Sequence, residues 1–284
     1  MSAVFNFTFV PWFRAVAPYI HAYRGKTFVV AFGGEMVASG AVESVVQDIN
    51  LLTSLGIRVV IVCGSRPQID AALAARGLTC EFSHGIRVTP SHVMDCVKEA
   101  VGRLRIEFEQ RFSFGLPNTP MAGSTVRVIS GNFITARPVG IVDGVDFQHS
   151  GLVRKVDVDG IMRTLDMGAM VLLSPFGFSP TGEAFNLTME EVATSVATAL
   201  QADKLIFLTE VPGIRMRPNE PASEDNPIDT ELPLATAEAL LAELPPANHP
   251  TDVGFYLQHC VKACEEGVER SHILSFAEIG RAHV

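Results

Sequence analysis

The chain has 284 residues, of which 48% are hydrophobic and 19% charged, and its formal net charge is -9. That length and apolar content allow a sizeable core, either in one large α/β domain or in two smaller ones. The negative charge and the lack of a basic run argue against nonspecific binding to nucleic acid or to an anionic membrane, because both depend on clustered Lys and Arg. No apolar run is long enough to span a bilayer.

Five cysteines without CxxC spacing predict reduced thiols and a cytoplasmic protein rather than a disulfide framework. Cys260 and Cys264 lie one helical turn apart beside His259, which allows a metal site; small buried thiols on an apolar helix face are the alternative interpretation. The first residues, MSAVFNFTFVPWF, have neither a charged n-region nor a small-residue cleavage site, so they do not indicate a signal peptide.

Residues 9–23 (FVPWFRAVAPYIHAY) carry apolar side chains at helical spacing and predict an amphipathic helix ahead of the first strand. This helix either packs on its own domain or forms an arm that docks on another subunit. The aromatic anchors Trp12 and Tyr19 favour the arm, because aromatic side chains are enriched in protein interfaces.

Residues 27–35 (TFVVAFGGE) predict the element around which the chain is organised: a parallel strand, a glycine turn and the start of a helix. The uninterrupted apolar run of residues 28–32 is typical of a strand buried on both faces. Gly33 and Gly34 allow the backbone to turn sharply and to approach a bound group closely. An enzyme that handles phosphate would place a cation near this turn, yet the residue two before Gly33 is Ala31.

A second strand is predicted at residues 58–62, after a helix at 41–55, and it completes a βαβ unit. The loop after this strand, CGSRP at residues 63–67, keeps only Gly64, whereas a phosphate cradle needs several consecutive glycines. We then expect a helix at 68–76, a loop at 85–90 (GIRVTP) and Ser91 as the N-cap of a helix at 93–112.

The middle of the chain, residues 126–157, has short β-prone runs broken by SerGly and AspGly turns, which predict antiparallel hairpins on one edge of the sheet. Residues 217–233 are polar and proline-rich and predict a surface loop. The remaining expected elements are helices at 158–167, 186–200, 234–243 and 252–266 and strands at 169–174, 204–209 and 271–276.

This order of elements resembles the amino-acid kinase fold. The likeness rests on motifs that occur in order at the family's spacing: GlyGly at 33–34, GIRVTP at 85–90, SGNF at 130–133, FNLT at 185–188 and GVERSHIL at 267–274. The resemblance covers essentially the whole chain. It implies a three-layer αβα sandwich with a mainly parallel central sheet and a β-hairpin insertion.

Within that family the chain is similar to the N-terminal domain of the bacterial N-acetylglutamate synthases, through PYI at 18–20, RGKTFV at 24–29, LLTSLGIR at 51–58, RPQID at 66–70 and GNFITARPVG at 131–140. In those enzymes a C-terminal acetyltransferase domain transfers acetyl from acetyl-CoA to L-glutamate, the first step of arginine biosynthesis. Acetyl transfer needs a coenzyme A site and a base for the amine, and we expect neither in this chain. The resemblance therefore implies no catalytic residue and no bound cofactor among these residues.

Departures from the kinase pattern argue against the alternative, an acetylglutamate kinase that phosphorylates N-acetylglutamate with ATP. The two lysines of that enzyme correspond to Ala31 and, by spacing, to about Tyr256, and its glycine-rich loop falls on Gly64 and its neighbours. Phosphoryl transfer is mostly positioning and charge stabilisation, so the loss of both cations and of the amide cradle removes the chemistry. What the resemblance leaves is a degenerate kinase-like substrate site, comprising Gly33, Gly34, Gly64, Arg87 and Asn186. For Arg87 and Asn186 the alternatives are an arginine paired to a carboxylate and a helix cap.

The resemblance also implies that L-arginine is a feedback effector, bound between the N-terminal helix and the loop after the last strand. On this sequence that site corresponds to Tyr19 and His272, with Arg58 as a supporting residue. A strand-end histidine satisfied by local contacts is the alternative for His272. The N-terminal helix is expected to join copies of the chain into a homo-oligomer. A stand-alone arginine-binding regulator without an enzyme partner is the remaining alternative.

These inferences divide the chain into an N-terminal helix arm (1–24), a C-terminally truncated kinase-like domain (25–278) and a tail (279–284), with the acetyltransferase domain absent. The tail, IGRAHV, offers neither a helix cap nor apolar residues at helical spacing. It equals the translation of ATCGGAAGAGCACACGTC, the opening of a common sequencing adapter. We therefore expect a non-native appendage that packs on nothing.

Overall fold

The computed structural model describes residues 9–113, 126–210, 213–215, 228, 231–244 and 253–276, and only the backbone of residues 9, 10, 12 and 13. The Trp12 side chain, most of the predicted surface loop at 217–233 and the tail at 279–284 therefore lie outside what it describes. In the described part, no helix is long and apolar enough to cross a membrane.

The centre of the molecule is a parallel sheet of six strands in the order β14-β13-β1-β2-β10-β5. Their bounds are β1 (Thr27–Phe32), β2 (Arg58–Cys63), β5 (Val128–Ile129), β10 (Met170–Leu173), β13 (Lys204–Thr209) and β14 (Arg270–Ser275). All six residues of β1 are buried, as the uninterrupted apolar run predicts for a strand covered on both faces. Within the described residues β14 pairs with β13 alone, so it forms one edge of the sheet.

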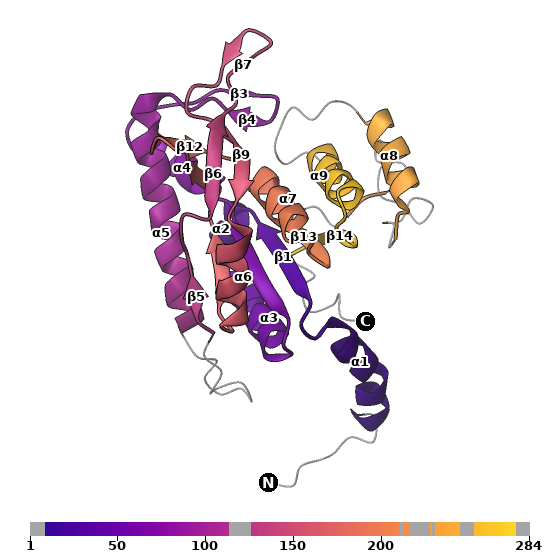
Figure 1. Ribbon diagram of the computed structural model, residues 1–284. Helices are drawn as coiled ribbons and strands as arrows, with labels where there is room; N and C mark the ends of the chain where they lie inside the picture. Colours follow the sequence, from indigo (N-terminus) through magenta and orange to yellow (C-terminus); the bar gives the residue numbers. More distant parts are fainter. Residues whose placement is uncertain are drawn as a thin grey trace.

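Helices cover both faces of this sheet and give the molecule three layers (Figure 1). On one face lie α6 (Val158–Asp166), α7 (Met189–Ala199) and α9 (Val253–Glu265); on the other lie α2 (Gly34–Ser39), α3 (Val42–Ser54) and α5 (Met94–Ser113). Next to these, α4 (Arg66–Ala74) packs on α5, and α8 (Leu234–Glu243) packs on α9. Alternate residues of β1 enter the two cores, because successive side chains of a strand point to opposite faces. The predicted three-layer α/β sandwich is confirmed.

A second sheet has four strands in the order β12-β11-β6-β9, with β6 (Ile134–Pro138), β9 (Gly151–Val156), β11 (Phe176–Phe178) and β12 (Ala184–Asn186). The antiparallel pairing of β6 with β9 confirms part of the hairpin prediction for residues 126–157. That prediction is wrong for β5, which pairs in parallel with β10 and extends the central sheet. The hairpin of β11 and β12 is absent from the sequence analysis, because three-residue strands are too short to show alternation.

Two small hairpins complete the fold: β3 (Phe82–Ser83) with β4 (Ile86–Arg87), and β7 (Ile141–Val142) with β8 (Val145–Asp146). The segment expected as a plain loop at 85–90 therefore contains a short strand. Its pairing partner is too short to leave an apolar pattern in the sequence.

Ser91 does not cap α5, and that prediction is wrong. Ser91 begins a 3-10 turn, η1 (Ser91–Val93), whose N-cap is Pro90, and α5 starts at Met94. The Ser91 hydroxyl instead lies 2.9 Å from His149 Nε2. A hydroxyl can bond either the local backbone or a tertiary partner, and here the tertiary partner prevails.

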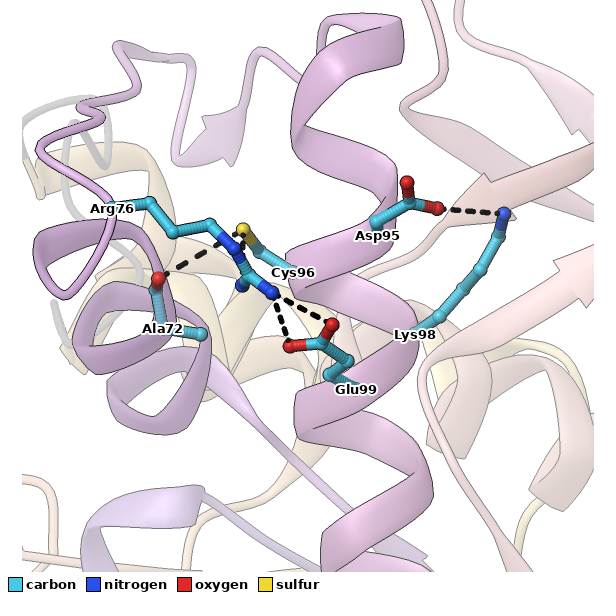
Figure 2. A network of polar contacts seen from close by, with 6 residues as sticks. All are labelled: Ala72, Arg76, Asp95, Cys96, Lys98 and Glu99. Carbon is cyan, nitrogen blue, oxygen red and sulfur yellow. Dashed lines mark hydrogen bonds and ion pairs between the residues drawn. The ribbon is translucent and has the colours of Figure 1, made fainter.

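A polar network ties α4 to α5 (Figure 2). Arg76, just after α4, donates to both carboxylate oxygens of Glu99 at 2.7 and 2.8 Å and to the Cys96 sulfur at 3.1 Å. The same sulfur lies 3.9 Å from the carbonyl oxygen of Ala72. These contacts hold α4 in place, and the first residue of α4, Arg66, reaches the site described below.

The N-terminal helix α1 (Phe9–Tyr23) forms as predicted, and Figure 1 shows it extending away from the sheet. Its last residue, Tyr23, packs edge-on against Phe28 with ring centroids 5.5 Å apart. Lys204 Nζ of β13 lies 4.3 Å from the centroid of the Tyr23 ring. Tyr19, one turn earlier, is 65% exposed. The C-terminal end of α1 is thus anchored on the sheet, while Tyr19 faces outward.

Candidate functional site

A solvent-open hollow lies beyond the carboxyl ends of β1 and β2. In open parallel sheets, ligands bind at this end of the strands. The turn after β1, the turn after β2, the hairpin strand β4 and the end of β12 all contribute to its wall. All five residues of the proposed kinase-like site line it, namely Gly33, Gly34, Gly64, Arg87 and Asn186.

The two glycine turns touch each other, and this contact requires glycine. Gly64 donates its N–H to the Phe32 carbonyl at 2.8 Å. A Cβ on Gly64 would lie 3.1 Å from Gly33 Cα and 3.4 Å from the Gly34 nitrogen, closer than a side chain accepts without moving the backbone. A Cβ on Gly33 would meet only the end of the Glu35 side chain, which can move away.

An arginine lies between two carboxylates in the hollow. Glu35, Arg66 and Glu190 belong to the first turns of α2, α4 and α7. Arg66 Nη2 lies 3.4 Å from Glu190 Oε1, and Arg66 Nη1 lies 3.7 Å from Glu35 Oε1. A helix N-terminus favours an anion and disfavours a cation, so the carboxylates hold Arg66 against the dipole of its own helix.

Glu190 is fully buried, and this burial raises the pKa of its carboxyl, which the nearby Arg66 lowers again in part. Two buried oxygens here, Glu190 Oε2 and Ser65 Oγ, have no hydrogen-bond partner among the described residues. Tyr256 of α9 also lines the hollow, and burial together with the Glu190 charge raises the pKa of its hydroxyl. Residues that line the hollow therefore include two buried oxygens without a hydrogen-bond partner among the described residues.

Arg66, Glu35 and Glu190 are not among the site residues predicted from the sequence. A signal was present: each is a charged residue in the first turn of a helix that follows a strand of the core. Which of many such residues meet in space depends on the order of the strands, which a single sequence does not show.

Arg87 enters the hollow but is also engaged by the protein. It is 5% exposed, its Nη2 lies 2.6 Å from Asp70 Oδ1, and its guanidinium carbon lies 4.6 Å from the centroid of the Phe82 ring. The interpretation of an arginine paired to a carboxylate thus applies to Arg87, alongside its place in the wall of the hollow.

Asn186 is the last residue of β12, and its Nδ2 donates to Thr89 Oγ1 at 3.1 Å. The alternative that Asn186 caps a helix is wrong. Thr188 caps α7 instead, accepting from the Glu191 N–H at 3.2 Å. Ser150, buried like Thr89, donates to Thr89 Oγ1 at 2.9 Å and so ties this strand end to the segment that carries Arg87.

The two positions that correspond to the kinase lysines carry no charge. Ala31 is fully buried within β1, and Tyr256 packs against Phe207 with ring centroids 5.6 Å apart. Arg66 does bring a cation into the hollow, but it faces two carboxylates, which neutralise it.

The three residues expected at the arginine site, with Arg58 in a supporting role, lie on three different elements, α1, β14 and β2. Tyr19 faces outward from α1, His272 lies on β14, and Arg58 begins β2 and pairs with Asp166 at 3.4 Å. The strand order places β13 and β1 between β14 and β2, a separation of roughly 14 Å at the usual strand spacing.

His272 is not satisfied by local contacts at both ring nitrogens, since its Nε2 has no partner among the described residues. Burial, followed by the charges of Lys204 and Arg270, lowers the pKa of His272 to about 4. Lys204, which the sequence analysis does not name, thus lies near both His272 and the Tyr23 ring. Lys204 of β13 and Arg270 of β14 thus lie close enough to His272 to disfavour its protonated form.

The side chains that allowed a metal site face different partners. His259 Nδ1 lies 3.1 Å from Thr194 Oγ1, Cys264 Sγ lies 3.3 Å from Ser271 Oγ, and Cys260 is buried with a raised thiol pKa caused by that burial. Across the described residues no group of three or more possible ligating side chains is found. The arrangement fits thiols and a neutral histidine packed in the core.

The family model that matches this chain is described as the amino acid kinase family and covers residues 26–275. Among curated proteins, an amino-acid acetyltransferase of Ralstonia nicotianae is 54% identical over 269 residues, which span 95% of this chain and 57% of that protein. An amino-acid acetyltransferase of Photobacterium profundum is 46% identical over 271 residues, spanning 95% and 60% of the two chains.

Among solved structures, an N-acetylglutamate synthase from Neisseria gonorrhoeae, complexed with coenzyme A and L-arginine, matches with a TM-score of 0.84 and 34% identity over 96% of this chain and 61% of that chain. A carbamate kinase from Giardia lamblia bound to AMP-PNP shares the fold. It matches with a TM-score of 0.67 and 18% identity over 91% of this chain and 95% of that chain. The chain spans less than two thirds of the length of the acetyltransferases that it matches. Because the family model covers residues 26–275 of 284, this chain belongs to the amino acid kinase family.

Proposed function

We propose that this chain is the arginine-sensing part of an N-acetylglutamate synthase, the enzyme that transfers acetyl from acetyl-CoA to L-glutamate. The observation that carries the proposal is the 54% identity, over 95% of this chain, to a protein named amino-acid acetyltransferase. The part of that relative which this chain does not match leaves room for a domain that binds acetyl-CoA and L-glutamate.

In this proposal residues 25–278 form the kinase-like domain, residues 279–284 are a non-native tail, and the protein works in the cytoplasm. Residues 1–24 form an arm through which copies of the chain associate. The outward-facing Tyr19 supports the arm, because an exposed aromatic side chain on a projecting helix is a suitable anchor for a second subunit.

The hollow beyond β1 and β2 supports a domain without kinase activity. Ala31 and Tyr256 supply no cation, and Arg66 is neutralised by its two carboxylates, so the charge that develops on a transferring phosphoryl group would not be stabilised. The purified chain, given ATP and N-acetylglutamate, should release no ADP above the background without protein. Acetylglutamate-dependent release of ADP would contradict this part of the proposal.

The cationic edge of the sheet supports the binding of L-arginine through its carboxylate. Lys204, which lies against the Tyr23 ring of α1, and Arg270 are both near His272, whose Nε2 has no partner among the described residues. Charged donors such as Lys204 and Arg270 bind carboxylates well. Tyr19 would contribute from the helix. Because two strands separate Arg58 from His272, we propose for Arg58 a supporting role without ligand contact.

Calorimetry with L-arginine tests this site. The wild-type chain should bind, and His272→Ala should weaken binding by about tenfold or more, as expected for a lost hydrogen bond to a charged group. His92→Ala, which removes an exposed histidine on η1, is the matched control and should bind like the wild type. No heat of binding in the wild type, or an equal loss in both variants, would count against the site.

Gel filtration tests the arm separately. A chain that lacks residues 1–24 should elute later than the full chain, because it has lost the surface through which copies associate. An unchanged apparent size after correction for the shorter chain would count against the arm.

A further inference from the structure

We propose that Ser91, His149 and Glu183 form a second, nucleophilic site, in which the Ser91 hydroxyl accepts the acyl group of small carboxylic esters. None of these three described residues lines the hollow beyond β1 and β2, and none belongs to the proposed arginine site. The proposal is therefore independent of the proposed function, and either can fail without the other.

The three side chains lie in the order that activates a serine. The Ser91 hydroxyl oxygen lies 2.9 Å from His149 Nε2, and His149 Nδ1 lies 3.3 Å from Glu183 Oε1. An ionised carboxylate only accepts hydrogen bonds, so the ring nitrogen beside Glu183 carries the hydrogen, and the lone pair of Nε2 faces the Ser91 hydroxyl. Nucleophile, base and orienting carboxylate in this sequence are the arrangement used in acyl transfer by serine.

Backbone hydrogen bonds join the three segments that carry these side chains. The His149 N–H donates at 3.0 Å to the carbonyl of Thr89, which precedes Ser91 by two residues. The Asn186 N–H donates at 2.9 Å to the His149 carbonyl, and Asn186 follows Glu183 by three residues. Thr89 and Asn186 are both buried. The relative positions of nucleophile, base and carboxylate are thus set by buried backbone, as a reactive site requires.

The turns next to His149 and Glu183 are also held. Gln148 has a φ of 51°, a conformation that residues other than glycine adopt only where the surrounding contacts impose it. Its N–H donates to Asp146 Oδ1 at 3.0 Å. The Glu183 N–H donates to Ser179 Oγ at 3.0 Å, and the Glu183 carbonyl accepts from the Ser179 N–H at 2.8 Å. Both turns therefore orient their side chains through several contacts each.

The nucleophile is open to an acyl donor. Ser91 is exposed and begins η1 directly after Pro90. His149 keeps 25% of its side chain exposed, and Glu183 keeps 52%. Because Glu183 brings a negative charge to this place, an ester without negative charge fits it better than an anionic acyl donor.

The reaction needs no group beyond these three side chains, the ester and water. Ser91 Oγ attacks the carbonyl carbon of the ester, and its proton passes to His149 Nε2, while Glu183 accepts from the Nδ1–H of the imidazolium. The bond from the carbonyl carbon to the leaving oxygen then breaks, and that oxygen takes the proton from Nε2 and departs as an alcohol. Water attacks the acyl group on Ser91 in the same way, releases the carboxylic acid and restores the hydroxyl.

Covalent labelling with a fluorophosphonate, which reacts with activated serines, tests the nucleophile. Peptide mass spectrometry of the labelled full chain should find the probe on Ser91, and Ser91→Ala should not be labelled there. Ser113→Ala is the matched control, because it removes an exposed serine of α5 whose hydroxyl donates to the Glu109 carbonyl at 2.7 Å. This control should be labelled like the wild type. No label on Ser91, or equal labelling of Ser91 and Ser113, would overturn the proposal.

Hydrolysis of p-nitrophenyl acetate tests the other two residues. His149→Ala removes the base and should lower kcat/KM by about 100-fold. Glu183 is a positioning residue that does not touch the ester, so Glu183→Gln should lower kcat by about tenfold and leave KM unchanged. His92→Ala, which removes the exposed histidine next to Ser91, is the matched control and should hydrolyse the ester like the wild type.

The two variants keep the test decisive. If His149→Ala does not fold, Glu183→Gln serves in its place, and its labelling by the fluorophosphonate should also be about tenfold slower than that of the wild type. Unchanged hydrolysis in a folded His149→Ala variant, or unchanged kcat and labelling in a folded Glu183→Gln variant, would overturn the proposal.

Discussion

The substitution Arg66→Ala would leave the buried carboxylate of Glu190 without a cation. Removing one partner of a buried ion pair costs about 3–5 kcal/mol of the free energy of unfolding. Arg66 keeps 19% of its side chain exposed and lies 3.4 Å from Glu190 Oε1. Both features weaken the pair, so we expect the lower end of that range, about 3 kcal/mol near neutral pH.

The pH dependence identifies Glu190 as the cause. Burial raises the pKa of Glu190 in the folded state, and loss of Arg66 raises it further. A carboxyl group whose folded pKa is raised destabilises the protein when it is ionised, and the penalty fades as falling pH protonates it. The deficit of Arg66→Ala relative to the wild type should therefore be largest at about pH 7 and smaller at about pH 5.

Urea denaturation of four proteins at both pH values measures this effect: wild type, Arg66→Ala, the double variant Arg66→Ala with Glu190→Gln, and Arg103→Ala. The double variant should recover much of the lost stability, because no buried charge remains. Arg103 pairs with Glu107 on α5 with 81% of its side chain exposed, so Arg103→Ala should cost less than about 1 kcal/mol. A deficit for Arg66→Ala below about 1 kcal/mol, or one that is equal at both pH values, would refute the reasoning.

Three further predictions concern a glycine turn, a helix cap and a buried histidine. Gly64→Ala should lower the free energy of unfolding, measured in urea, by about 1–3 kcal/mol, because its Cβ would lie 3.1 Å from Gly33 Cα. The control Gly102→Ala lies in open space on α5 and should instead raise the free energy of unfolding by about 0.5–1 kcal/mol. Equal effects of the two substitutions would contradict this prediction. Thr188→Ala should cost about 1 kcal/mol in the same assay, because the hydroxyl caps α7; a neutral result would disprove the role of this cap. Burial lowers the pKa of His259 to about 4, so the free energy of unfolding should fall by up to about 3 kcal/mol as the pH drops from about 6.5 towards 4. His259→Gln should make the free energy of unfolding depend less on pH over this range. A pH profile equal to that of the wild type would count against this prediction.

Much of the fold was accessible from the sequence because its elements carry their own local signals. The buried strand and glycine turn at residues 27–35 are marked by an uninterrupted apolar run and paired glycines, and the structure places β1 and α2 there. The helices predicted at 41–55 and 234–243 are found at Val42–Ser54 and Leu234–Glu243. Such elements need only the periodicity of their own side chains to be recognised.

Other features depended on partners that are far away in the chain. The two residues of β5 show no strand pattern, and their parallel pairing with β10 decides that they extend the central sheet. Ser91 has the chemistry of an N-cap, but His149 takes its hydroxyl. Strand pairing and hydroxyl partners of this kind are set by tertiary contacts, which a single sequence does not encode in any local pattern.

The site divides in the same way. Composition and motifs alone determined that this chain has glycine turns after its first strands and no lysine at position 31 or 256. Only the tertiary structure decided that Arg66 meets Glu35 and Glu190, and that β13 and β1 separate Arg58 from His272. The physical reason is that residue type sets what a side chain can bind, whereas the order of strands in the sheet sets which side chains meet.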